Sequence, residues 1–138
     1  MEVMSTSELP LRKSRFNGMH VLVVEDDADL RSLIYVGLLL QGMSGDAAAD
    51  GLEGLKYALE RKYDVVISDI RLPGLGGIDL ARRICKMERH PKVILLTAYA
   101  NPQMVKDGVA AGACRVLSKP IGLKALAQAV LELSLIHI

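Results

Sequence analysis

Five side chains with acidic, hydroxyl or amine groups follow the ends of short apolar runs in this sequence. They are Glu25 and Asp26 after the first run, Asp69 after the third, Thr97 after the fourth and Lys119 after the fifth. If the runs are parallel strands, their carboxyl ends lie at one edge of a sheet, where α/β proteins bind ligands. Any one of these residues alone would be read as a helix cap or a turn, but the whole set in this order predicts a single site.

The charges of this set predict a bound cation. Three clustered carboxylates repel one another strongly, and the lysine offsets one of them, which leaves a formal charge of −2. The side-chain ligands on offer are oxygens, so the ion should be hard, with Mg²⁺ as the first choice and Mn²⁺ as the second. With the acids screened, one carboxylate can act as a nucleophile. Lys119 is a compact cation, and the Thr97 hydroxyl can donate a hydrogen bond.

The elements that must position these residues follow from the hydrophobic pattern. Five apolar runs, the second of them weak, predict strands at 20–24, 43–48, 64–68, 92–96 and 114–118. The spacing of apolar residues between and after the runs predicts helices that begin near 30, 52, 78, 102 and 123. The fourth helix has Asn101 as its expected cap, with proline at its first position. Strands that alternate with helices five times favour an α/β fold with a parallel sheet and helices on both faces.

Length and composition argue against several classes of protein. The 138 residues fit one domain, and the 51% apolar fraction can fill one core. A formal net charge of +1 gives no sign of nucleic acid or an anionic membrane as partner. No apolar run reaches the roughly 18 residues of a membrane span, and the first residues lack the apolar block of a secretory signal. We therefore expect a cytoplasmic protein in which Cys85 and Cys114 stay reduced.

The two ends of the chain differ from the rest. Residues 1–18 are weakly basic and contain a proline and a glycine, so we expect a flexible N-terminal extension rather than a nucleic-acid arm. Residues 19–133 carry the whole pattern of strands and helices as one domain. Residues 134–138 are apolar for a free terminus, and we expect them to form a tail that is a linker or cloning remnant.

Four segments of the sequence resemble the receiver domain of two-component response regulators. They are VLVVEDD at 21–27, DVVISDIRLPGLGG at 64–77, VILLTA at 93–98, and the stretch from Gly112-Ala113 to Leu117-Ser118-Lys119-Pro120. The resemblance covers about residues 19–133. It implies a doubly wound, flavodoxin-like sheet of five parallel strands in the order 2-1-3-4-5. It also implies a signalling switch rather than an enzyme, one that takes a phosphoryl group from a histidine kinase or a phosphotransfer protein.

The resemblance assigns roles to the acidic residues. Asp69 becomes the phosphoacceptor. Asp26, Asp69 and the backbone carbonyl of Arg71 become the Mg²⁺ ligands, and Glu25 acts mainly through water. Few protein ligands are needed, because Mg²⁺ normally keeps several of its waters.

The resemblance also implies how the switch works. Lys119 and Thr97 contact the phosphoryl group, and movement of Thr97 toward it turns a local change of charge into a change of surface. In this family, partners or a second copy often bind the face formed by the fourth helix, the fifth strand and the fifth helix. The exposed residues expected on that face here are Lys106, Arg115 and Lys124.

The sequence departs from the family pattern at two positions. Glu25 stands where aspartate is more common, and we expect metal binding to survive this change. Val116 stands where receivers usually carry a tyrosine or phenylalanine whose ring moves with Thr97, so the aromatic coupling is in doubt. Tyr99 could replace it in part, although a surface aromatic is the plainer interpretation. The resemblance also implies that the positions two after the phosphoacceptor and two after the threonine influence phosphate lifetime. Here they are Arg71 and Tyr99, both large enough to restrict attack by water, so we expect slow self-dephosphorylation.

Two other functions fit parts of the sequence. Asp27-Ala28-Asp29 imitates the Asp-x-Asp motif of haloacid-dehalogenase-like phosphatases, but it lies beyond the strand end and no cap domain is visible. We favour the plainer interpretation of Asp27 and Asp29 as a helix cap or solvated loop acids. The second alternative is a degenerate receiver that only binds partners, and the presence of all the acids, the threonine and the lysine argues against it.

Overall fold

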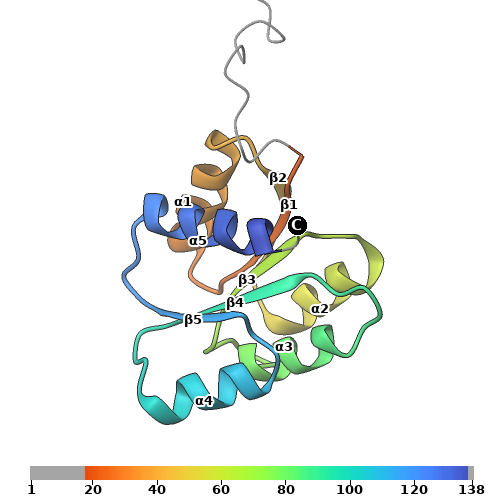
Figure 1. Cartoon of the computed structure of the whole chain (residues 1–138), viewed down its shortest axis with the longest axis vertical. Helices are drawn as coiled ribbons and strands as arrows, with labels where there is room; N and C mark the ends of the chain where they lie inside the picture. The colour runs from red at the N-terminus through yellow and green to blue at the C-terminus, as the bar shows by residue number, and fades with distance from the viewer. Residues whose placement is uncertain (1–17, 137–138) are drawn as a thin grey trace, which may run out of the picture.

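The computed structural model describes residues 18–136 as five strands that alternate with five helices (Figure 1). The strands are β1 His20–Val24, β2 Ser44–Ala48, β3 Val65–Asp69, β4 Lys92–Thr97 and β5 Arg115–Ser118. The helices are α1 Ala28–Leu40, α2 Gly51–Glu60, α3 Gly77–Cys85, α4 Pro102–Ala110 and α5 Leu123–Ile136. All strand pairs are parallel and the sheet order is β2-β1-β3-β4-β5, which confirms the expected topology.

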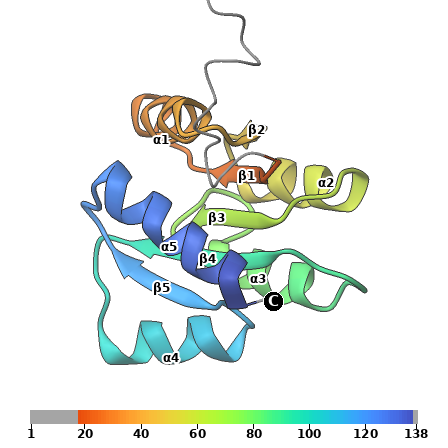
Figure 2. The ribbon, with the colours of Figure 1, turned by 45° about the horizontal axis from the view of Figure 1, so that its top comes forward.

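Two hydrophobic cores hold the sheet between two layers of helices. α1 and α5 cover one face, and α2, α3 and α4 cover the other (Figures 1 and 2). Because side chains alternate along a strand, Val21 and Val23 of β1 join the core under α1 and α5, whereas Leu22 and Val24 join the opposite core. Every residue of β3 is buried, as expected for an inner strand that is covered on both faces. Strand β2 lies at the sheet edge and is made of small and polar residues, which explains its weak hydrophobic signal.

Polar residues that follow the strand ends also begin the helices. The Asp27 carboxylate accepts hydrogen bonds from the backbone N–H groups of Asp29 and Leu30, so Asp27 is the N-cap of α1. Asn101 caps α4 and Pro102 follows it, which confirms that prediction. The Asp27 contact confirms the interpretation of this residue as a helix cap.

The last helix, α5, spans the predicted end of the domain. α5 continues to Ile136, so the predicted domain boundary after residue 133 falls inside this helix. Residues 1–17 and 137–138 lie outside the described residues, so the predicted flexible extension and the end of the predicted tail stay predictions. None of the helices described here is long and apolar enough to cross a membrane.

Gly77, the first residue of α3, packs against the backbone at the end of β3. A Cβ atom on Gly77 would lie 2.1 Å from the carbonyl oxygen of Asp69 and 2.8 Å from the Cα of Ile70. Because those atoms cannot move without shifting the buried strand, we expect Gly77→Ala to lower the free energy of unfolding by about 2–4 kcal/mol in urea denaturation. Gly76→Ala is the matched control, since its Cβ atom would lie 3.7 Å from the carbonyl oxygen of Ile70, and it should cost no more than about 1 kcal/mol. Equal costs for the two variants would contradict the packing argument.

Candidate functional site

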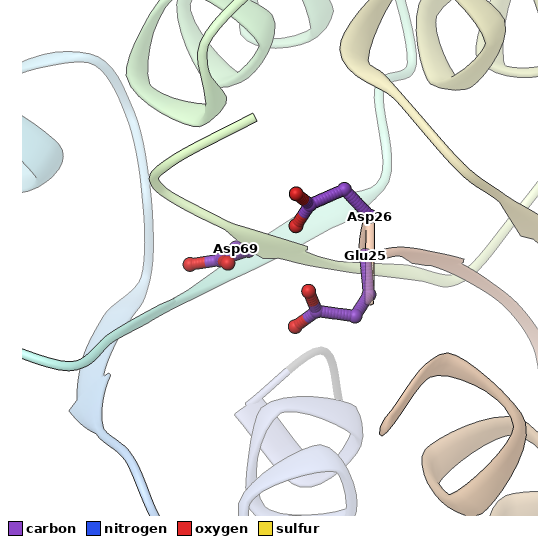
Figure 3. A group of neighbouring side chains, drawn as sticks. All are labelled: Glu25, Asp26 and Asp69. Carbon is purple, nitrogen blue, oxygen red and sulfur yellow. The ribbon is translucent and has the colours of Figure 1, made fainter. Parts of the chain in front are cut away.

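The adjacent ends of β1 and β3 bring the acidic residues together. Val24 of β1 pairs with Ser68 of β3, so Glu25 and Asp69 follow at neighbouring positions. Each of Glu25, Asp26 and Asp69 has a carboxylate oxygen within 4.8 Å of those of the other two (Figure 3). The convergence that the strand ends predicted is therefore present for all three acids.

Lys119 joins this cluster from the loop that follows β5. Its Nζ donates hydrogen bonds to Oε1 of Glu25 at 2.8 Å and to Oδ2 of Asp69 at 3.0 Å. The side chains of Lys119, Glu25 and Asp69 are 20%, 2% and 10% exposed, so both ion pairs are largely shielded from bulk water. Burial raises the pKa of Glu25 by more than the hydrogen bond from Lys119 lowers it. Burial alone would lower the pKa of Lys119, but its bonds to the two carboxylates outweigh this effect and raise the pKa, so the lysine stays charged.

Backbone contacts hold the first strand end in place. The backbone N–H of Asp27 donates to Oε2 of Glu25 at 3.1 Å. Arg31, in the first turn of α1, donates from Nη1 to the carbonyl oxygen of Glu25 at 2.9 Å and to that of Asp26 at 3.4 Å. Sequence reasoning did not identify Arg31, because nothing in residue type or spacing distinguishes it from a solvated arginine on a helix.

The donor set fits a hard divalent cation. The Asp26 carboxylate is exposed and takes no hydrogen bond or ion pair from any residue between 18 and 136, so it is available to a ligand. Three carboxylates beside one lysine carry the formal charge of −2 expected from the sequence. The backbone N–H of Arg71 donates to Oδ1 of Asp69 at 3.3 Å, which places the backbone of residue 71 beside the cluster. Oxygen ligands, net negative charge and one open carboxylate are what Mg²⁺ prefers.

Thr97 ends β4 beside β3, but its hydroxyl has its partners outside the acidic cluster. Thr97 is 1% exposed. Its Oγ1 donates to the sulfur of Met104 at 3.1 Å and accepts from the backbone N–H of Tyr99 at 3.1 Å. The structure thus brings Glu25, Asp26, Asp69 and Lys119 together, whereas the Thr97 hydroxyl is bonded to α4. Met104 is a second residue that sequence reasoning missed.

Arg71 and Tyr99 lie together beside the segment that follows β4. The Arg71 guanidinium carbon lies 5.9 Å from the centroid of the Tyr99 ring. With Ala98, Ala100, Asn101 and Met104 they line a surface hollow of about 450 Å³. Tyr99 is 68% exposed, so the plainer interpretation of a surface aromatic describes its position in this structure.

Val116 packs between β4 and α4. A Cβ atom on Gly108 of α4 would lie 2.8 Å from Cγ2 of Val116 and 3.2 Å from Cδ1 of Leu95. The glycine therefore lets α4 approach β5 closely, and this packing explains why a residue of low helix propensity stands inside α4. Position 116 carries no aromatic ring, and α4 occupies the adjacent space.

Comparison with known proteins places the whole arrangement in one family. The family model of the response regulator receiver domain matches residues 21–131. The two-component response regulator PhoP of Pseudomonas aeruginosa is 39% identical over 102 residues, which are 74% of this chain and 45% of PhoP. This chain therefore spans less than half the length of that relative.

Solved structures agree with this comparison. The receiver domain of the Francisella response regulator 1452 has a TM-score of 0.79 at 29% identity, over 84% of this chain and 96% of that one. A chain in the co-crystal structure of the Saccharomyces cerevisiae phosphotransfer protein Ypd1 with the receiver domain of Ssk1 has a TM-score of 0.77 at 25% identity, over 85% and 89% of the two chains.

These findings decide between the families considered. The haloacid-dehalogenase alternative required a free Asp27, and the structure uses that carboxylate as a helix cap. The matching family model covers most of the sequence and includes every strand whose end contributes to the acidic cluster. The chain belongs to the response regulator receiver domain family of two-component signalling.

Proposed function

We propose that this domain accepts a phosphoryl group on Asp69 from a phosphohistidine donor and thereby switches a partner-binding surface. The observation that supports this best is the contact of Lys119 with Glu25 and Asp69 beside the unpaired carboxylate of Asp26. Phosphoryl transfer depends mainly on positioning and charge neutralisation, which such a cluster supplies. In this proposal the domain is a signalling switch that acts on itself, and Glu25 acts mainly through water.

The proposed transfer begins with attack by one carboxylate oxygen of Asp69 on phosphorus. A bond forms between that oxygen and phosphorus, the bond from phosphorus to the imidazole nitrogen of the donor breaks, and the donor keeps the electron pair. Mg²⁺, or Mn²⁺ in its place, would be held by Asp26, Asp69 and the carbonyl of Arg71 and supplies charge neutralisation for the phosphoryl oxygens when bound. Lys119 exchanges its contact with Asp69 for one phosphoryl oxygen, and the Thr97 hydroxyl donates to another.

The partners of this chain follow from the same proposal. The Ypd1–Ssk1 complex pairs a phosphotransfer protein with a receiver domain of this fold, and we propose a histidine kinase or phosphotransfer protein as the donor here. The output surface is the face of α4, β5 and α5, which is also where a homodimer would form. Lys106 and Lys124 are exposed on that face, and Arg115 is half-buried. The compartment in this proposal is the cytoplasm, where Cys85 and Cys114 remain the free thiols of the structure.

Mass spectrometry after treatment with Mg²⁺ and acetyl phosphate tests the proposal. The wild-type protein should gain one phosphoryl group that maps to Asp69, and Asp69→Ala should gain none. Asp27→Ala should be phosphorylated like the wild type, whereas a haloacid-dehalogenase-type nucleophile would show the reverse dependence. Absence of any adduct on the folded wild-type protein would leave a module that binds partners without phosphate.

Arg71 and Tyr99 should prolong the life of the phosphorylated state. Their side chains lie together and line a hollow beside residues 98–101, which directly follow Thr97, and in this proposal they restrict the approach of water. We expect the Arg71→Ala, Tyr99→Ala double variant to lose its phosphoryl group roughly 3- to 10-fold faster than the wild type, as measured by the decay of phospho-Asp69. Tyr57 of α2 and Arg61, which follows that helix, form a similar pair, and their double alanine variant serves as the control. Equal phosphate lifetimes in wild type and the Arg71, Tyr99 variant would refute the hypothesis.

A further inference from the structure

The hydroxyl of Thr97 is held by a thioether from α4. Thr97 Oγ1 donates to Met104 Sδ at 3.1 Å, and among the residues that the structure describes it donates to no carboxylate. The same oxygen accepts from the backbone N–H of Tyr99 at 3.1 Å. Since Thr97 is 1% exposed, both hydrogen-bonding functions of its hydroxyl are satisfied without bulk water, in a position that does not serve a phosphoryl group.

The capped start of α4 determines where the sulfur lies. Asn101 caps the helix, and its Oδ1 accepts from the backbone N–H of Met104 at 2.8 Å. Pro102 follows the cap and restricts the backbone of the first turn. Met104 is partly buried against the core formed with α2 and α3, so its side chain is packed rather than free on the surface. The contact with Thr97 therefore links the end of β4 to the first turn of α4.

From this geometry we propose that Met104 is a positioning residue that holds Thr97 in the resting state and sets how readily the domain switches. The inference rests on the proposed function, because it concerns the movement of Thr97 toward a phosphoryl group on Asp69. In that movement the hydroxyl exchanges a weak sulfur acceptor for a charged oxygen, which is the stronger partner. Loss of the sulfur contact at the same time frees the first turn of α4.

The residues around position 116 make this link more important in this chain. Val116 has no aromatic ring to move with Thr97, and Gly108 packs α4 closely against it. Thr97 and Met104 instead provide a direct hydrogen bond from the strand end to α4. Through this contact, a change at the proposed phosphoacceptor site would alter the surface of α4.

The proposal predicts the sign of a substitution at Met104. Leucine has a similar volume but no acceptor, so Met104→Leu leaves the buried Thr97 hydroxyl without a hydrogen-bond acceptor in the resting state only. An unsatisfied buried donor destabilises the state that contains it, so the switched state should gain population. Glutamine restores an acceptor on a side chain of similar length, and Met104→Gln should not favour switching.

Calorimetric titration with beryllofluoride in the presence of Mg²⁺ tests this on the full chain, because beryllofluoride imitates the phosphoryl group. Met104→Leu should bind beryllofluoride roughly 3- to 10-fold more tightly than the wild type, and Met104→Gln no more tightly. In the Thr97→Val background, which lacks the hydroxyl, Met104→Leu should change the affinity by less than about twofold. The affinity for Mg²⁺ alone should be the same in all variants, since neither side chain hydrogen-bonds to a residue of the acidic cluster.

The outcomes separate this inference from the proposed function. If the wild-type protein binds Mg²⁺ but no beryllofluoride, the proposed function itself is wrong. If the wild type binds beryllofluoride and Met104→Leu binds it with the same affinity, the role of Met104 is overturned while the proposed function stands. If Met104→Leu raises the affinity for beryllofluoride equally with and without the Thr97 hydroxyl, the effect comes from packing of α4, and the inference is also overturned.

Discussion

Replacing Asp26 by asparagine is expected to weaken Mg²⁺ binding by at least about 10-fold while leaving the fold as stable as the wild type or more stable. Asp26 is exposed, lies within 4.8 Å of the oxygens of Glu25 and Asp69, and has no hydrogen-bond partner for its carboxylate among residues 18–136. Without a cation the three acids repel one another, so loss of one charge relieves the repulsion. The Mg²⁺ affinity from calorimetric titration should therefore fall, whereas the melting temperature in metal-free buffer should stay the same or rise. Phosphorylation by acetyl phosphate should fall together with the Mg²⁺ affinity.

Asp27→Asn is the matched control for this prediction. It removes the same charge one residue along the chain, where the carboxylate caps α1 by accepting from the backbone N–H groups of Asp29 and Leu30. Asparagine caps helices as well as aspartate does, so stability should stay within about 0.5 kcal/mol and Mg²⁺ affinity within about twofold. A metal site that needs Asp27, or one that is indifferent to Asp26, would contradict the assignment of ligands.

The sheet and the acidic cluster follow from local features of the sequence. Apolar runs such as Val21–Val24 read as buried strands because they are too short for helices and end at charged residues. Once the strands are parallel, the topology alone brings Glu25 and Asp69 to neighbouring positions. The positions of Glu25 and Asp69 at adjacent strand ends could therefore be inferred from the sequence alone. Their roles in phosphoryl transfer stay proposals.

Features that depend on side-chain orientation could not be inferred in this way. The sequence did not indicate the partner that the Thr97 hydroxyl has in this structure, which is Met104 on the following helix. Arg31 reaches back from α1 to two backbone carbonyls, a contact that depends on the angle at which the helix leaves the strand. The end of α5 also depends on packing. Leu133 is 2% exposed and packs in the core beside α1, so tertiary packing carries the helix beyond the last clear sequence signal.

Lys119→Met should have a large effect on stability when no metal is present. Lys119 is the shared counter-charge of Glu25, which is 2% exposed, and of Asp69, which is 10% exposed. Removing one partner of a buried ion pair typically costs about 3–5 kcal/mol because the remaining charge stays buried. Lys119 is itself 20% exposed, so water can partly replace it. We therefore expect a somewhat smaller loss in the free energy of unfolding, about 2–4 kcal/mol, in urea denaturation at neutral pH.

The pH dependence of this loss identifies its cause. Burial already raises the pKa of Glu25, and the hydrogen bond from Lys119 opposes that rise, so the variant should raise the pKa further. Its native state then takes up a proton at a pH where the unfolded chain has not, and the deficit should shrink as the pH is lowered through the raised pKa. Added Mg²⁺ should also recover part of the loss by supplying counter-charge, whereas Lys124→Met, at an exposed position of α5, should change stability by less than about 0.5 kcal/mol. A Lys119→Met protein that unfolds like the wild type in metal-free buffer at neutral pH would show that the two carboxylates do not depend on this lysine.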